Sequence, residues 1–280
     1  MEDVPFKAIS DELEVAAGDY RVRVTLANDP GVIYDSGTIS LASGVEYVAI
    51  ASEVFSNTAP IGLTILTDLG STPVVTVDDE RARVRVVHAS ADAPLVDIAV
   101  DGADVLNDVP FAVGSDYLLL PSDTYNIDVA LAANSQSVIN ADLMFDPATD
   151  YTIAAVNSAA NIEPLVLQDD NTAPGAGNVK VRLVHAAPSA GLVDIYITAP
   201  TTDILNINPT LNDVPFKADS GYLEVPEGDY RVRIAVAGTK TVAIDTGTLS
   251  LSAGQIRTAF ALDPTHGSAN FGVLLLNDLN

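Results

Sequence analysis

The sequence predicts an all-β protein built as a tandem array of β-sandwich modules, and two observations carry this prediction. The first is self-similarity at a fixed spacing: the tripeptide Val-Pro-Phe occurs at 4–6, 109–111 and 214–216, each time 105 residues further on. The second is strict alternation of apolar and polar residues, as in residues 20–26, which is the period of a strand with one buried face. Repetition at a fixed period indicates an array of similar units.

Other segments keep the same register. A tyrosine opens an alternating strand at Tyr20, Tyr125 and Tyr230, again 105 residues apart. The segment 35–41 returns as 245–251, which is 210 residues later. The repeat therefore runs through the whole chain.

Within the second unit, alternation and turn residues predict about seven strands, and no segment shows an apolar stripe of helical period. The expected strands are 83–88, 95–100, 116–120, 125–131, 138–144, 150–156 and 162–167. Seven short strands in one such unit predict a sandwich of two sheets.

Changes in composition place the module boundaries. The expected domains are 1–70, 81–170 and 178–280, separated by linkers rich in Gly, Pro, Asp and Thr. Both linkers are short, so we expect restricted motion between modules.

The first module is expected to be incomplete. The second and third modules begin with 83–88 and 180–185 and pass a second strand before Val-Pro-Phe, whereas the first has three residues there. Two strands are therefore missing. Three candidates could replace them: another chain, further residues of a longer natural chain, or a fold-back of 73–77. We expect one of the first two, because one five-residue strand cannot replace two.

Charge and composition exclude several functions. The chain has 13 basic and 38 acidic residues, a net charge of −25 that repels nucleic acid and anionic lipid. It has no cysteine, which excludes disulfides and thiolate chemistry. No apolar run approaches the roughly 18 residues that span a bilayer, and the N-terminus does not read as a signal peptide. We expect neither nucleic-acid partners nor membrane insertion.

Two segments carry a family resemblance. Residues 86–98, and 183–188 followed by 193–196, resemble the signature of the domain of unknown function 4397. The resemblance implies an immunoglobulin-like or prealbumin-like sandwich in an exported bacterial or archaeal protein, and hence an extracellular or cell-surface location. It implies no activity and brings no catalytic residues.

His88, Ser90 and Asp97 are the residues that a Ser/His/Asp interpretation would combine. Against it, Ala187 stands where Ser90 stands, and no Gly-x-Ser-x-Gly occurs. His88 shares its side of the strand with Val86, so we expect it, like its counterpart His185, to be buried and bonded to backbone. We predict no catalytic or cofactor-binding residue and no enzyme activity.

The sequence gives little support for a metal site. His88 and His185 belong to different modules and His266 stands alone, which disfavours zinc. The acidic groups 78–80, 169–170 and Asp101 with Asp104 follow no EF-hand template. No metal site is predicted, and calcium at the linkers stays an alternative.

Most arginines are expected on outward strand faces, paired with Asp or Glu on neighbouring strands. They are Arg21, Arg23, Arg83, Arg85, Arg182, Arg231 and Arg233.

These observations favour a non-catalytic exported repeat protein with a structural, adhesive or assembly role at the cell surface. Its expected partners are other copies of itself or another surface protein, with strand exchange at the incomplete first module. The alternatives are a ligand-binding module for glycan or calcium, and an accessory domain of a larger exported enzyme.

Overall fold

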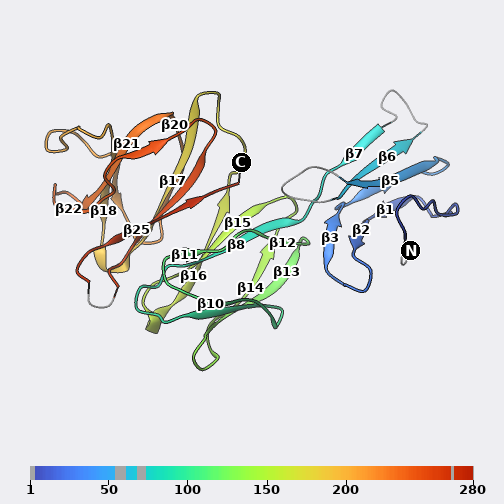
Figure 1. Cartoon of the computed structure of the whole chain (residues 1–280), viewed down its shortest axis with the longest axis horizontal. Coiled ribbons are helices and arrows are strands. Elements are labelled where there is room, and N and C mark those ends of the chain that lie inside the picture. The colour runs from blue at the N-terminus through green and yellow to red at the C-terminus, as the bar shows by residue number, and fades with distance from the viewer. Residues whose placement is uncertain (1–3, 54–60, 68–73, 266–267, 280) are drawn as a thin grey trace. The chain divides into compact units, whose positions relative to one another are not determined.

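The regular structure of this chain is β-strand. The computed structural model describes residues 4–53, 61–67, 74–265 and 268–279, so His266 and linker residues 70–73 lie outside it. Across those ranges there are two short 3-10 turns, Ala159–Asn161 and Pro188–Ala190, and no α-helix (Figure 1). The predicted all-β class is confirmed.

The third module is a sandwich of two sheets. One sheet has the strand order β20-β17-β24-β25, and the other has β19-β18-β21-β22 with β23 beside β21. The strands are β17 (Asn178–Ala186), β18 (Val193–Thr198), β19 (Leu211–Val214), β20 (Asp219–Pro226), β21 (Gly228–Val236), β22 (Val242–Asp245), β23 (Leu249–Leu251), β24 (Ile256–Leu262) and β25 (Gly272–Asn277). Leu183, Ile195 and Ile234 contribute to the core.

The second module follows the same plan. Its sheets have the orders β10-β9-β13-β14 and β11-β8-β15-β16, with β12 beside β8. The strands are β8 (Ala82–His88), β9 (Val96–Val100), β10 (Ala103–Val109), β11 (Val113–Gly114), β12 (Leu118–Leu120), β13 (Asp123–Leu131), β14 (Gln136–Phe145), β15 (Asp150–Val156) and β16 (Glu163–Asp169). Val86, Ile98 and Val129 contribute to the core.

The first strand of the third module is central in its sheet and is covered on both faces. Strand β17 pairs in parallel with β24, from Lys180 beside Ile256 to Ala186 beside Leu262. Leu183 enters the module's own core, while the next residue, Val184, packs into a second cluster on the opposite face. Two covered faces explain why consecutive apolar residues interrupt the alternation here.

The sequence patterns did not predict strand β10. It pairs with β9 through two register shifts, so its apolar residues do not alternate. The turn before it is Asp101-Gly102, and both residues have positive φ, at 50° and 77°. An Asp-Gly pair is a strong signal for a two-residue hairpin, and it could have revealed this strand.

The first module repeats part of this plan. Its strands are β1 (Gly18–Tyr20), β2 (Arg23–Thr25), β3 (Val32–Asp35), β4 (Ile39–Leu41), β5 (Tyr47–Glu53), β6 (Ile61–Thr67) and β7 (Val74–Val77). The pair Gly18 and Leu41 recurs as Gly228 and Leu251, 210 residues later. The sequence repeat is therefore also a repeat of strand register.

The fold-back of 73–77, the disfavoured alternative, does not fill the gap, because residues 74–77 form a strand on the other edge of the sheet. Strand β7 pairs with β6, and the sheet order is β5-β6-β7. The counterpart of β5 in the third module is β24, which lies between β17 and β25. Strand β7 therefore does not replace the strand that corresponds to β17.

The chain divides into two compact units. One comprises Met1–Val84, Leu118–Thr124 and Met144–Thr149, and the other comprises Arg85–Tyr117, Tyr125–Leu143 and Asp150–Asn280. The module boundaries at 1–70, 81–170 and 178–280 stay a prediction.

Candidate functional site

His88 is a buried residue whose ring nitrogens both face backbone groups. Its Nε2 lies 3.0 Å from the carbonyl oxygen of Pro94, and its Nδ1 accepts the Ser90 N–H at 3.4 Å. The side chain of Asp97 instead accepts the N–H of Asp108 at 2.8 Å. The three residues of the Ser/His/Asp interpretation are therefore not assembled into a triad.

His185 repeats this arrangement in the third module. It is buried, its Nε2 lies 2.8 Å from the carbonyl oxygen of Gly191, and its Nδ1 accepts the Ala187 N–H at 3.3 Å. Both histidines also meet a phenylalanine edge-on, Phe111 in one module and Phe216 in the other. The expectation that the two are buried, equivalent and bonded to backbone is confirmed.

The acidic linker residues have protein cations as partners. The carboxylate of Asp170 accepts a hydrogen bond from Lys180 at 2.7 Å, which together with Thr172 lowers the pKa of Asp170 to about 2. Asp79 is paired with Arg81 at 2.7 Å. Across the described residues, no group of three or more His, Cys, Asp or Glu is placed to hold a metal ion.

Several arginines form the expected cross-strand pairs. Asp35 accepts from Arg21 at 2.6 Å and from Arg23 at 2.9 Å, and Arg231 pairs with Asp245. Burial alone would raise the pKa of Asp35, but these hydrogen bonds hold it below its usual value.

The outward placement predicted for Arg85 and Arg182 is wrong in one respect. Both point away from their own sandwich core, yet they are only 1% and 2% exposed. The outer face of each sheet is covered by the other module, which the strand pattern of a single module does not reveal. Arg233 is also buried, and it donates to the hydroxyl of Thr198.

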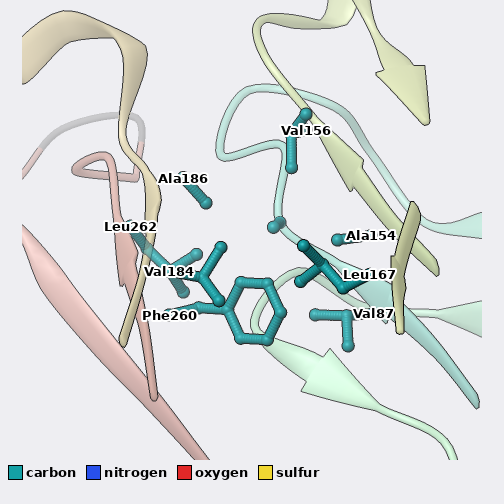
Figure 2. Close-up of a cluster of buried hydrophobic side chains, with 9 residues drawn as sticks. Val87, Ala154, Val156, Leu167, Val184, Ala186, Phe260 and Leu262 are labelled. Carbon is teal, nitrogen blue, oxygen red and sulfur yellow. The ribbon is translucent and has the colours of Figure 1, made fainter. Parts of the chain in front are cut away.

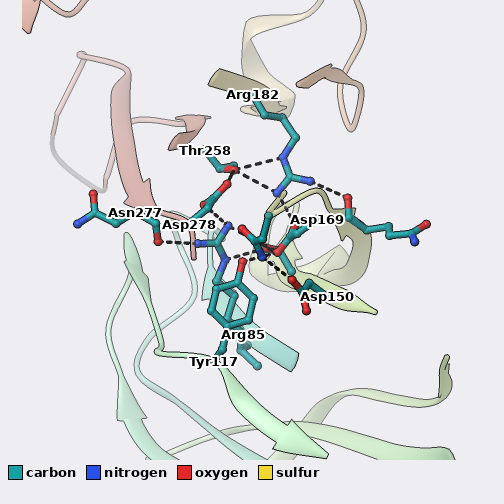
Figure 3. Close-up of polar contacts among 12 residues, drawn as sticks. Arg85, Tyr117, Asp150, Asp169, Arg182, Thr258, Asn277 and Asp278 are labelled. Carbon is teal, nitrogen blue, oxygen red and sulfur yellow. Dashed lines mark hydrogen bonds and ion pairs between the residues drawn. The ribbon is translucent and has the colours of Figure 1, made fainter. Parts of the chain in front are cut away.

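Two arginines and two aspartates form a buried quartet between the second and third modules (Figure 3). Arg85 lies 2.6 Å from Asp278, and Arg182 lies 2.5 Å from Asp169. Each arginine thus pairs with the aspartate of the other module. Each also donates to a carbonyl oxygen of the other module, Arg85 to Asn277 and Arg182 to Gln168.

Each aspartate of the quartet is held in place by its own module. The second oxygen of Asp169 accepts hydrogen bonds from Thr152 and Tyr117, both at 2.6 Å. In the third module, Asp278 accepts from Thr258 at 2.6 Å and from Tyr222 at 2.7 Å. Each carboxylate is therefore oriented before it meets the arginine of the other module.

The two tyrosines also cover the guanidinium groups. The guanidinium carbon of Arg85 lies 4.9 Å from the ring centre of Tyr117, and that of Arg182 lies 4.7 Å from the ring centre of Tyr222. Burial raises the pKa of both tyrosines, and for Tyr117 the carboxylate of Asp169 adds to this effect. Both therefore stay neutral and donate to their aspartates.

Figure 2 shows a cluster of buried hydrophobic side chains from the same strands. It adjoins the quartet, because Val87 and Val184 lie two residues beyond Arg85 and Arg182. It contains matching residues of the two modules, such as Val87 with Val184 and Val156 with Leu262. The remaining members are Ala89, Ala154, Leu167, Ala186 and Phe260. We call this cluster and the quartet together the paired face. Because each module contributes the same positions, the contact has the form of an isologous dimer interface within one chain.

Sequence reasoning missed the paired face, although a signal was present. Arg85 and Arg182 occupy the same place in the first strands, and Asp169 and Asp278 stand at the ends of the last strands, Asp169 as the final residue of β16 and Asp278 just after β25. When charged residues recur at matched positions of two modules, and their neighbours on the same sheet face are apolar, the pattern indicates that another module covers that face.

The first module presents a different surface, its open edge, which we define as β5 and residues 9–16. Strand β5 is an edge strand, and no described strand lies on its outer side. Residues 9–16 correspond to β20 but form no strand, and Ile9 and Leu13 are 95% and 72% exposed. In the third module, β17 fills the place between β20 and β24.

The sequence profile of the domain of unknown function DUF4397 matches residues 82–196 and 197–280. The chain belongs to this family. The two consecutive matches agree with tandem modules, and they contain both halves of the paired face. The first module lies outside the matched segments of this DUF4397 protein.

Two solved structures show distant likeness. One is a carbohydrate-binding module of family 26 from Eubacterium rectale Amy13K, solved in complex with maltoheptaose. It is 9% identical, with a TM-score of 0.23, and the match covers 71% of this chain and 98% of that module. A candidate cell adhesion protein from Bacteroides fragilis NCTC 9343 is 13% identical, with a TM-score of 0.18. The match covers 94% of this chain and 95% of the adhesion protein. No curated protein matches this sequence. No helix in the described ranges is long and apolar enough to cross a membrane.

Replacing Arg85 by Met should strongly destabilise the protein. The change leaves Asp278 buried without its cation, and breaking a buried pair in this way costs about 3–5 kcal/mol. Urea unfolding of the whole chain, followed by circular dichroism, measures the loss.

The matched control is Lys217→Met, because Lys217 pairs across the same two modules with Glu163 at 2.9 Å but is exposed. An exposed pair contributes at most about 1 kcal/mol. Equal, small losses for the two variants would show that the quartet does not hold the modules together.

Acidification should destabilise the protein between pH 7.5 and 5.5. Burial lowers the pKa of His88 in the folded state, whereas in the unfolded state its pKa is about 6.5. As the pH falls, the unfolded state therefore binds the proton first, and the free energy of unfolding decreases. The carboxylates whose pKa is lowered affect the pH dependence of stability only at more acidic pH. Melting temperatures at the two pH values should differ less in His88→Gln than in the wild type, and an unchanged difference would contradict this assignment.

Proposed function

We propose that this chain is a non-catalytic module array with a structural, adhesive or assembly role at the cell surface. We further propose that its first module takes up a β-strand from a second copy of the chain. The open edge carries this proposal. By the 210-residue repeat, β5 and residues 9–16 are the counterparts of β24 and β20, and the described residues of the first module include no counterpart of β17.

An exposed strand edge is a template for another strand, because its N–H and C=O groups lack partners. In the third module the place between β20 and β24 is occupied by β17, antiparallel to the first and parallel to the second. The corresponding geometry in the first module would pair an incoming strand with residues 9–16 and with β5. Uptake would also cover the exposed side chains of Ile9 and Leu13.

The third module indicates which backbone groups of β5 face the open side. Lys180 N–H donates to the carbonyl oxygen of Gln255 at 3.0 Å. Alternate residues of β24, including Ala259, therefore face β17. The residue 210 positions before Ala259 is Ala49, so its N–H should face the incoming strand rather than β6.

Charge and family support the surface role. A net charge of −25 gives a soluble exterior that repels other acidic surfaces, so backbone pairing would supply the specific contact between copies. The family resemblance implies export.

Strand uptake predicts concentration-dependent assembly. Light scattering should give masses above that of the 29.2 kDa monomer, increasing with concentration. Ala49→Pro removes one N–H from the open side without interrupting the β5–β6 pairing, so it should reduce assembly, since proline cannot donate to a strand.

Ala49→Ser keeps the N–H and is the matched control, which should assemble like the wild type. A wild-type protein that stays monomeric at all concentrations would overturn strand uptake from a second copy. Equal assembly of the proline and serine variants would do the same.

A non-catalytic protein should show no hydrolysis in a broad screen for esterase, glycosidase and peptidase activity. Because both imidazoles are engaged with backbone groups, His88→Ala with His185→Ala should give the same background as the wild type. An activity that the two substitutions abolish would contradict the proposal.

A further inference from the structure

The third module contains a cavity between its two sheets. Its volume is about 280 Å³, and the side chains of Leu183, Ile195, Ile234 and Ala259 are among those that line it. These residues belong to or border the module's own core, on the side of β17 opposite the paired face. Val184, which belongs to the paired face, is also in the lining, so the cavity adjoins that face across β17.

The wall of the cavity is apolar and uncharged. The polar side chains in its lining are those of Thr246 and His185. The Thr246 hydroxyl donates to the carbonyl oxygen of Gly247 at 3.0 Å and accepts the Val232 N–H at 3.1 Å. Both ring nitrogens of His185 face backbone groups. These polar groups have protein partners, so the cavity offers a guest mainly apolar contact.

The second module shows how such a space can be filled. Its Ile153 stands where the third module has Ala259, as the matched threonines Thr152 and Thr258 establish. Ile153 is buried. The smaller side chain at position 259 therefore leaves room in the third module.

The cavity reaches the surface at the edge strand β25. Val273 and Leu275 line it and are 36% and 41% exposed. An entry lined by aliphatic side chains admits an apolar molecule without placing a charge in the wall.

We propose that the third module binds one small uncharged apolar molecule between its sheets. An apolar cavity of about 150 Å³ holds benzene, so about 280 Å³ accommodates a guest of roughly ten carbon atoms. A lining without charged side chains favours a neutral aliphatic or aromatic guest over a fatty acid inserted by its carboxylate. This inference does not depend on the proposed assembly function.

The test uses the whole chain and two neutral probes. N-phenyl-1-naphthylamine fluoresces strongly only in an apolar environment, and 1-decanol should displace it from the cavity. We expect saturable binding with one site per chain. Ala259→Ile should weaken binding at least tenfold, Ala259→Val should weaken it less, and the melting temperature without probe should not fall.

Ala133→Ile, which adds the same side chain at an exposed position of the second module, is the matched control and should bind like the wild type. Equal binding by Ala259→Ile and the control would place the probe on another apolar surface and overturn the proposal. Absence of saturable binding by the wild type, or failure of 1-decanol to displace the dye, would also overturn it. If Ala259→Ile does not fold, the Ala259→Val variant decides by the same comparison.

Discussion

The exchange of charges between Arg85, Asp278, Arg182 and Asp169 is the contact on which the pairing of the second and third modules depends. Taking four charges out of water costs several kcal/mol per ion, and mutual attraction offsets this only with good geometry and further hydrogen bonds. Here Thr152, Tyr117, Thr258 and Tyr222 supply those bonds. Arginine suits the role better than lysine, because its planar group can donate to several partners and stack on a ring.

This chemistry also explains why the modules occur as a pair. A module alone would expose an arginine and the free oxygen of an aspartate on an otherwise apolar sheet face. The first module does not carry the same set, since Val48 stands where the others have Thr152 and Thr258, and Glu12 where they have Tyr117 and Tyr222. Its side chains therefore cannot form the quartet, and the association that we propose for it uses the backbone of the edge strand β5 instead.

Much of the fold follows from the sequence, because the repeat and the alternation are local patterns. The repeat shows which strands of the modules correspond. His88 and Val86 are two residues apart in one strand, so they lie on the same side of it, and the burial of His88 followed from that. The edge strand β10 was not predicted, because bulges break its alternation, although Asp101-Gly102 marked its turn.

The paired face escaped prediction for a different reason. Strand parity placed Arg85 and Arg182 on the outer face of their sheets, but only the fold shows that the outer face of one module covers that of the other. Matched charges at repeated positions were visible in the sequence. Their burial depends on contacts between residues about 190 positions apart, such as Arg85 and Asp278, which no local pattern contains.

The two faces of the third module's central strand have different physical roles. On the inner face, the side chains that border the apolar cavity lack neighbours on one side and lose the dispersion contacts that close packing would give. On the outer face, Val184, Phe260 and Leu262 pack against matching residues of the second module and bury apolar area there. The outer face therefore contributes packing energy, while the inner face keeps the space in which we propose that a guest binds.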